Sequence, residues 1–137
     1  MLMPKKLKFR KSHKGKRGGK ASRLTHISFG EYGLKSLEAC WVSARQIEAT
    51  RRVLTRYIKK GGKIWIRIFP HKPVTGKSGE VPMGKGKGAV DHYVAVVKPG
   101  MILFEMEGIT TEMAKKAIES AIHKLPIKCT FVTKHVK

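Results

Sequence analysis

The sequence predicts an α+β fold, in which two helices pack on one face of a mostly antiparallel sheet. Residues 44–60 and 111–125 place apolar side chains three and four residues apart, as one face of a helix requires. Residues 64–69 instead alternate with the two-residue period of a strand. Several shorter apolar runs are bounded by Gly or Pro. The length of 137 residues suffices for one domain with a buried core.

The first helix is expected to begin after Ser43 and to run to Lys60. Ser43 is a favourable N-cap, and Gln46 three residues later completes a capping box. Gly61 supplies the left-handed residue that follows many helices. One face of this helix is apolar and contains Ile47, Thr50, Leu54, Tyr57 and Ile58. A second face is basic and contains Arg45, Glu48, Arg52, Arg56 and Lys59. A basic helix face is most often solvated charge, but Glu48 is the only carboxylate of this one, which favours an anionic partner.

Strands are expected over residues 25–29, 32–37, 64–69, 92–98, 101–107 and 127–132. The strand after the helix is expected in the core, and Pro70 and Pro73 bend the chain out of the sheet. Pro99 and Gly100 predict a type II turn that joins the fourth and fifth strands as a hairpin. Glu105 and Glu107 are expected on a strand face exposed to solvent.

The second helix is expected to follow Thr110 as its N-cap and to stop before Pro126. Its outer side carries Lys115, Lys116 and Glu119. Its buried stripe contains Ala114, Ala117, Ile118, Ala121, Ile122 and Leu125.

The charge is high and unevenly distributed. Thirty Lys and Arg against nine Asp and Glu give a formal net charge of +21. Repulsion of this size opposes compaction, and the usual reason for it is a polyanion, either nucleic acid or, less often, an anionic membrane. Residues 1–30 hold ten basic residues and no acid, residues 31–90 hold thirteen and four, and residues 91–137 hold seven and five. The charge therefore lies mainly on the first two thirds of the chain.

Residues 1–20 are expected to form a basic extended arm, followed by a single α+β domain over residues 21–137. Phe9 is the one aromatic residue of the arm and could stack on a base or anchor the arm. The alternative is a targeting or solubilising tail. The arm residues expected to contact phosphates are Lys5, Lys6, Lys8, Arg10, Lys11, Lys14, Lys16 and Arg17. Those expected from the helix region are Arg45, Arg51, Arg52, Arg56, Lys59 and Lys60.

A Gly- and Lys-rich loop is expected over residues 76–88. It contains Gly79–Lys85, which matches the spacing of a P-loop. A P-loop continues with Ser or Thr and a helix, whereas here Gly86 and then a strand follow. Glycine-separated lysines instead suit close approach to a phosphate backbone.

The sequence contains no recognisable set of residues for catalysis or for metal binding. Cys40 and Cys129 are far apart and without a CxxC motif, and the six histidines share no ligand spacing. Two free thiols are expected, and no metal, no cofactor and no small-molecule substrate. No apolar run reaches the length of a membrane span, and the N-terminus lacks the apolar core of a signal peptide.

Three segments together resemble the bacterial large-subunit ribosomal protein sixteen family. They are Trp41–Ala49 with Arg51-Arg52, Gly62–Pro70, and Met83–Gly88, and the opening Met3-Pro4-Lys5 and Phe9-Arg10-Lys11 are similar too. The resemblance covers essentially the whole chain, and its motifs are highly specific. Family members often carry an arginine directly before the Met-Gly-Lys run, where this chain has Pro82.

The resemblance implies a hammerhead-like α+β fold and a structural, non-enzymatic role in the large ribosomal subunit, in the cytoplasm or in an organelle. It implies 23S rRNA, A-site tRNA and neighbouring ribosomal proteins as partners, near the peptidyl transferase centre. The loop expected near tRNA would contribute Lys77, Met83, Lys85 and Lys87. Two alternatives from other classes are a nucleotide-dependent enzyme that uses this loop and a free basic chaperone or DNA-compacting protein. The missing Ser or Thr argues against the first, and co-sedimentation with the large subunit decides the second.

Overall fold

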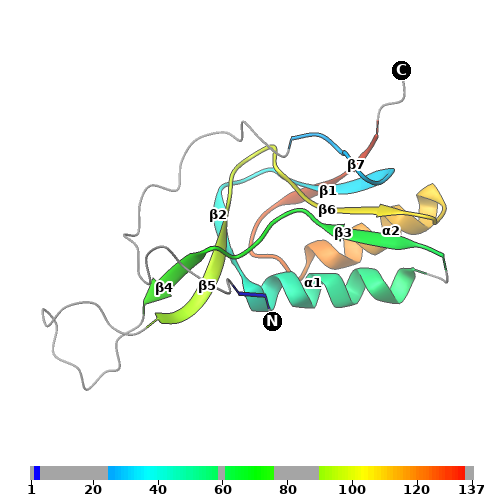
Figure 1. Cartoon of the computed structure of the whole chain (residues 1–137). Helices are drawn as coiled ribbons and strands as arrows, with labels where there is room; N and C mark the ends of the chain where they lie inside the picture. The colour runs from blue at the N-terminus through cyan, green and yellow to red at the C-terminus, as the bar shows by residue number, and fades with distance from the viewer. Residues whose placement is uncertain (1, 4–24, 59–60, 76–89, 135–137) are drawn as a thin grey trace, which may run out of the picture.

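The computed structural model describes residues 2–3, 25–58, 61–75 and 90–134 (Figure 1). Most of the expected arm and the whole of the expected loop at 76–88 lie outside these residues. The elements, in chain order, are β1 (Tyr32–Ser36), β2 (Cys40–Ser43), α1 (Ala44–Tyr57), β3 (Lys63–Ile66), β4 (Lys72–Thr75), β5 (Val90–Val97), β6 (Ile102–Glu107), α2 (Thr111–Ile122) and β7 (Cys129–Thr133).

Two antiparallel sheets replace the single sheet that the sequence predicts. One has four strands in the order β3-β6-β1-β7, and the other has three in the order β2-β5-β4. Both helices cover the same face of the four-stranded sheet, and the smaller sheet extends from one end of it (Figure 1). The predicted α+β class, with two helices on one sheet face, is confirmed. We call the face of the four-stranded sheet that the helices do not cover the far face.

The predicted hairpin of residues 92–107 is wrong, although its turn is correct. Gly100 has φ +94°, and the Met101 N–H donates to the Lys98 carbonyl over 3.2 Å. However, β5 pairs with β2 and β4, whereas β6 pairs with β1 and β3. The Gly100 N–H donates to the Ser36 carbonyl over 2.8 Å, which ties the turn to β1 where the chain passes from one sheet into the other.

Other boundaries also differ from expectation. The segment 25–29 is not a strand, and β2 and β4 occur where none was predicted. β4 accommodates Pro73 because it is the edge strand of its sheet, where a missing N–H costs no ladder bond. β3 is also an edge strand and ends at Ile66, and its Ile64 and Ile66 pack against the core while only partly buried.

The helix caps are largely as predicted, while both helices end early. Ser43 and Gln46 form the complete capping box, and the Thr110 side chain accepts from the Met113 N–H. α1 stops at Tyr57, where Ile58 is extended, and α2 stops at Ile122. Gly61 has φ +99° but lies beyond the cap, so it is not the residue that ends α1.

The core lies between the helices and the four-stranded sheet. Leu54 and Ile47 on α1, Ala117 and Ile118 on α2, and Phe104 on β6 are fully buried. The Tyr57 hydroxyl and the Ser120 hydroxyl lie 2.9 Å apart and join the two helices. This packing fixes which side of α1 remains outside.

Candidate nucleic-acid interface

The exposed side of α1 carries a row of arginines, which we call the arginine stripe: Arg45, Arg52 and Arg56. At 100° per residue these three lie within about 40° of one another, opposite the buried Ile47 and Leu54. The eleven residue steps from Arg45 to Arg56 cover about 16 Å of helix axis. The prediction that this helix has one buried apolar face and one exposed basic face is therefore confirmed.

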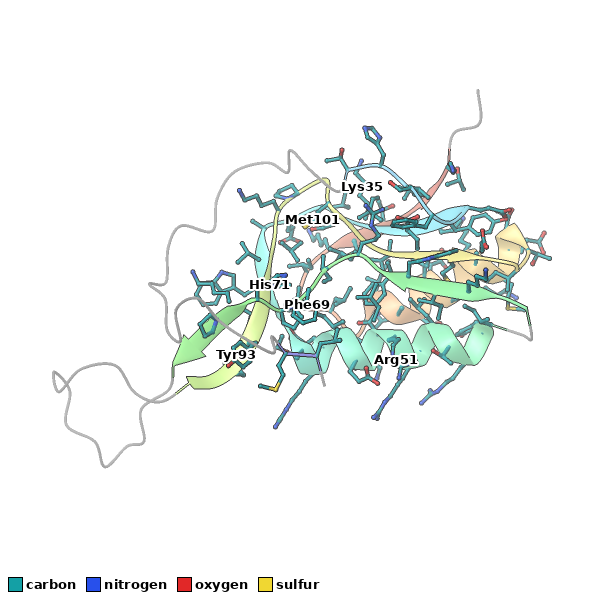
Figure 2. The ribbon with its side chains drawn as sticks, in the orientation of Figure 1. Lys35, Arg51, Phe69, His71, Tyr93 and Met101 are labelled. Atoms are coloured by element: carbon teal, nitrogen blue, oxygen red, sulfur yellow. The ribbon has the colours of Figure 1, made fainter. Side chains whose placement is uncertain are left out.

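Glu48 modifies one edge of the stripe and does not neutralise it. Its carboxylate accepts from the Arg51 guanidinium at 2.5 Å and lies 3.4 Å from Arg52 Nε. The hydrogen bond from Arg51 is the main reason that the pKa of Glu48 falls to about 2, and it outweighs the opposing effect of burial. Arg51 is thus committed to Glu48, and Figure 2 shows it on the side of α1 that points away from the sheets. Arg45 and Arg56 form no ion pair within the described part of the chain.

The other predicted contact residues lie outside the described residues. These are Lys5, Lys6, Lys8, Arg10, Lys11, Lys14, Lys16 and Arg17 of the arm, Lys59 and Lys60 after α1, and Lys77, Met83, Lys85 and Lys87 of the loop.

A buried ion pair on the far face overturns one prediction. Glu105 was expected to be exposed beside Glu107, but its side chain is completely buried. One carboxylate oxygen accepts the backbone N–H groups of Ser28, Phe29 and Gly30 at 3.1, 2.7 and 2.8 Å. The other oxygen accepts from the Arg67 guanidinium. The segment 25–30, which we call the strap, crosses the far face above this carboxylate (Figure 1).

These contacts decide the charge of Glu105. Burial opposes ionisation, but hydrogen bonds from Gly30, Arg67, Phe29 and Ser28 outweigh it and hold the pKa of Glu105 below its usual value. The sequence contained no local signal for this arrangement, because Glu105 and its backbone partners are more than seventy residues apart.

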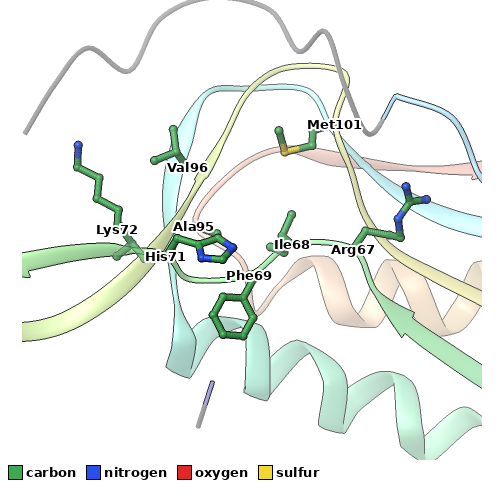
Figure 3. A pocket seen from close by; sticks show the side chains of 9 residues that line it. Arg67, Ile68, Phe69, His71, Lys72, Ala95, Val96 and Met101 are labelled. Atoms are coloured by element: carbon green, nitrogen blue, oxygen red, sulfur yellow. The ribbon is translucent and has the colours of Figure 1, made fainter. Parts of the chain in front are cut away.

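A hollow of about 340 Å³ lies where the chain passes from β3 to β4 (Figure 3). It is lined by Arg67, Ile68, Phe69, His71, Lys72, Val94, Ala95, Val96 and Met101. The Phe69 and His71 rings lie 4.6 Å apart, and the Lys72 amine lies 5.1 Å from the centre of the Trp41 ring. Among the described residues, the lining contains cations and no carboxylate, which suits contact with a polyanion rather than acid–base catalysis.

The described residues contain no candidate metal site, and both described cysteines are free thiols. No group of three His, Cys, Asp or Glu that could hold a metal occurs within the described ranges. Cys40 and Cys129 are both free thiols, as predicted, and burial with the nearby Glu38 charge raises the pKa of Cys129 to about 12. Among the described helices, none is long and apolar enough to cross a membrane.

Comparison with known proteins gives the family. The ribosomal protein L16p/L10e family matches residues 4–132. Two relatives, each named large ribosomal subunit protein uL16c, come from Gracilaria tenuistipitata and its variety liui. Each is 57% identical over 134 residues, covering 98% of this chain and 99% of the relative. The chain therefore belongs to the ribosomal protein L16p/L10e family, and it is a structural constituent of the large ribosomal subunit within the ribosome, not an enzyme.

Proposed function

We propose that this protein holds large-subunit rRNA, 23S rRNA in the bacterial case, through the arginine stripe, and that its other basic segments extend this contact. The observation that carries the proposal is the exposure of Arg45, Arg52 and Arg56 on one side of a helix whose other side is locked in the core. A guanidinium presents planar donors to phosphate oxygens and stacks on bases, so the row suits an RNA backbone. Membership in the family supports rRNA and ribosomal proteins as partners.

The stripe can be tested through the salt dependence of rRNA binding. Arg45, Arg52 and Arg56 are changed together to Gln, and the dissociation constant for large-subunit rRNA is measured against salt concentration. Each lost phosphate contact should reduce the logarithmic slope by roughly 0.7–0.9, so the triple variant should lose about 2–3 in slope.

A matched control removes the same charge elsewhere. Lys115, Lys116 and Lys124 are exposed residues of α2 and the turn after it. Their change to Gln should leave the slope close to that of the wild type. Equal effects of the two triple variants would mean that only net charge matters, and the proposed interface on α1 would be wrong.

We also propose that the arm reaches rRNA. Deleting residues 1–20 removes nine Lys or Arg residues and should weaken binding while making the salt slope shallower. The domain that follows should still unfold cooperatively, since every fully buried apolar side chain that the structure describes comes after residue 24, and only the half-buried Leu2 is lost from the edge of the core. A slope equal to that of the full chain would place the arm away from phosphates.

For the loop at 76–88 we propose contact with A-site tRNA near the peptidyl transferase centre, a role supported by the family and by the composition of the loop. Its Gly residues allow close approach, and its Lys residues supply charge. Changing Lys85 and Lys87 to Gln should spare subunit assembly and slow A-site occupancy by aminoacyl-tRNA. Poor assembly with normal tRNA binding once assembled would instead assign this loop to rRNA.

A further inference from the structure

Phe29 is a large aromatic side chain that the fold leaves in solvent. Its side chain is 57% exposed, and among the described residues only Met3 and Leu37 are comparable apolar groups. Leaving an aromatic ring in water is unfavourable, and an exposed ring at a fixed position is typical of a recognition surface.

Three contacts fix the position of Phe29. Its backbone N–H donates to the buried Glu105 carboxylate over 2.7 Å. Its ring stacks on Trp65 with centroids 6.0 Å apart and planes 22° apart. The guanidinium carbon of Arg67 lies 5.0 Å from the ring centroid. The ring is therefore pre-organised, which reduces the entropy lost when a ligand stacks on it.

The far face around Phe29 carries several cations, with Glu107 opposite Lys63 in the pairing of β3 with β6. Lys63 lies two residues before Trp65 on β3, so its side chain leaves the same sheet face and is exposed. A hollow of about 410 Å³ adjoins the strap, and the described residues that line it are Thr25, His26, Ile27, Lys35, Ile102, Val132, Thr133 and Lys134, none of them a carboxylate. Figure 2 shows Lys35 on the side of the sheet away from α1. The one carboxylate beneath the ring, Glu105, is neutralised by Arg67.

We propose that Phe29 is a stacking platform for an unpaired base of large-subunit rRNA, with the flanking phosphates held by the lysines of the far face. This inference rests on the proposed rRNA-binding function and adds a second contact surface, opposite the arginine stripe. An exposed ring offers a base the stacking that it loses on leaving an RNA helix. The described lining of the adjoining hollow is basic and holds no carboxylate, so it complements a phosphate backbone better than it complements another basic ribosomal protein.

The test compares Phe29→Leu, which keeps apolar bulk without the ring, with Phe29→Tyr, which keeps the ring. Binding of the full chain to large-subunit rRNA is measured against salt, together with chemical probing of unpaired nucleotides. Phe29→Leu should weaken binding about 5- to 150-fold, the range observed for loss of one base stack. The salt slope should stay unchanged because stacking releases no counterion, and Phe29→Tyr should bind like the wild type.

Probing should show one unpaired nucleotide that is protected by the wild type and by Phe29→Tyr but not by Phe29→Leu. Leu37→Ala is the matched control, since Leu37 is 52% exposed and not aromatic, and it should bind normally. Thermal unfolding shows that each variant is folded before binding is compared.

Two outcomes would overturn the inference. Normal rRNA affinity and protection in Phe29→Leu would show that no base stacks there, even if the arginine-stripe variant fails as expected. Normal rRNA binding together with poor incorporation into subunits would assign the ring to a protein neighbour. Failure of the proposed function is distinct, because it appears as an unchanged salt slope in the arginine-stripe variant.

Discussion

The carboxylate of Glu105 and the guanidinium of Arg67 form an ion pair within the far face, with the Glu105 side chain fully buried and the Arg67 side chain 11% exposed. The pair joins neighbouring strands, since Arg67 follows β3 and Glu105 lies in β6. The same carboxylate receives three successive backbone N–H groups of the strap. The Glu105 side chain thus joins the edge of the four-stranded sheet to the strap.

Replacing Glu105 by Gln should destabilise the domain by about 3–5 kcal/mol, because Arg67 would be left without its counter-charge in a desolvated site. The measurement is the free energy of unfolding in urea. Glu107→Gln is the matched control on the same strand face, and it should change stability by less than about 0.5 kcal/mol. Equal costs for the two substitutions would mean that the pair has no special role.

The double variant Glu105→Leu with Arg67→Met separates the ion pair from the strap contacts. If only the pair mattered, removing both charges would be nearly neutral. We expect a loss of at least about 2 kcal/mol to persist, because three backbone N–H groups lose their acceptor. Recovery of wild-type stability would show that the strap bonds contribute little.

Acid should weaken the domain through the same carboxylate. The pKa of Glu105 is lower in the folded protein than its ordinary value of 4.5, so its contribution to stability is complete above that value. The contribution is lost as pH falls from 4.5 through the folded pKa. The difference in unfolding free energy between the wild type and Glu105→Gln should therefore shrink below pH 4.5. A difference independent of pH from 7 to 3 would contradict this linkage.

Gly30→Ala should disturb the strap where it meets β6. A Cβ at this position would lie 2.6 Å from the Met106 carbonyl oxygen, which is backbone and cannot rotate away. We expect a cost of about 1–3 kcal/mol by thermal or urea unfolding. Gly33→Ala is the comparison, because its Cβ would meet mainly the adaptable Ile27 side chain at 3.2 Å and should cost less. The reverse order would contradict the packing described here.

The two faces of α1 should separate folding from binding. Leu54→Ala removes a fully buried side chain and should cost about 2–5 kcal/mol of stability. Arg52→Ala with Arg56→Ala should keep the helix, since Ala has the highest helix propensity, and should reduce rRNA affinity. Unfolding and rRNA binding are measured for both variants. Normal rRNA binding by the arginine variant would mean that the basic face of α1 is only solvated charge.

Much of this protein is determined by local sequence. The capping box of Ser43 and Gln46, the N-cap Thr110 and the turn at Gly100 depend on side chains within three or four residues, so the sequence predicts them correctly. The buried stripes of both helices follow from periodicity alone. The dense motifs at 41–49 and 62–70 indicated the family, which the comparisons confirm.

Tertiary structure decided the partners of these elements. A turn reverses the chain whether or not its strands pair, so the hairpin could not be distinguished from the observed crossing between sheets. Glu105 alternates with apolar neighbours as an exposed residue would, and only the distant strap and Arg67 make its burial favourable. Phe29 becomes a fixed, exposed ring for the same reason, because Trp65 and Glu105 reach it from segments more than thirty residues away. Local propensity acts over a few residues, whereas burial of charge and aromatic stacking depend on contacts that exist only after the chain has folded.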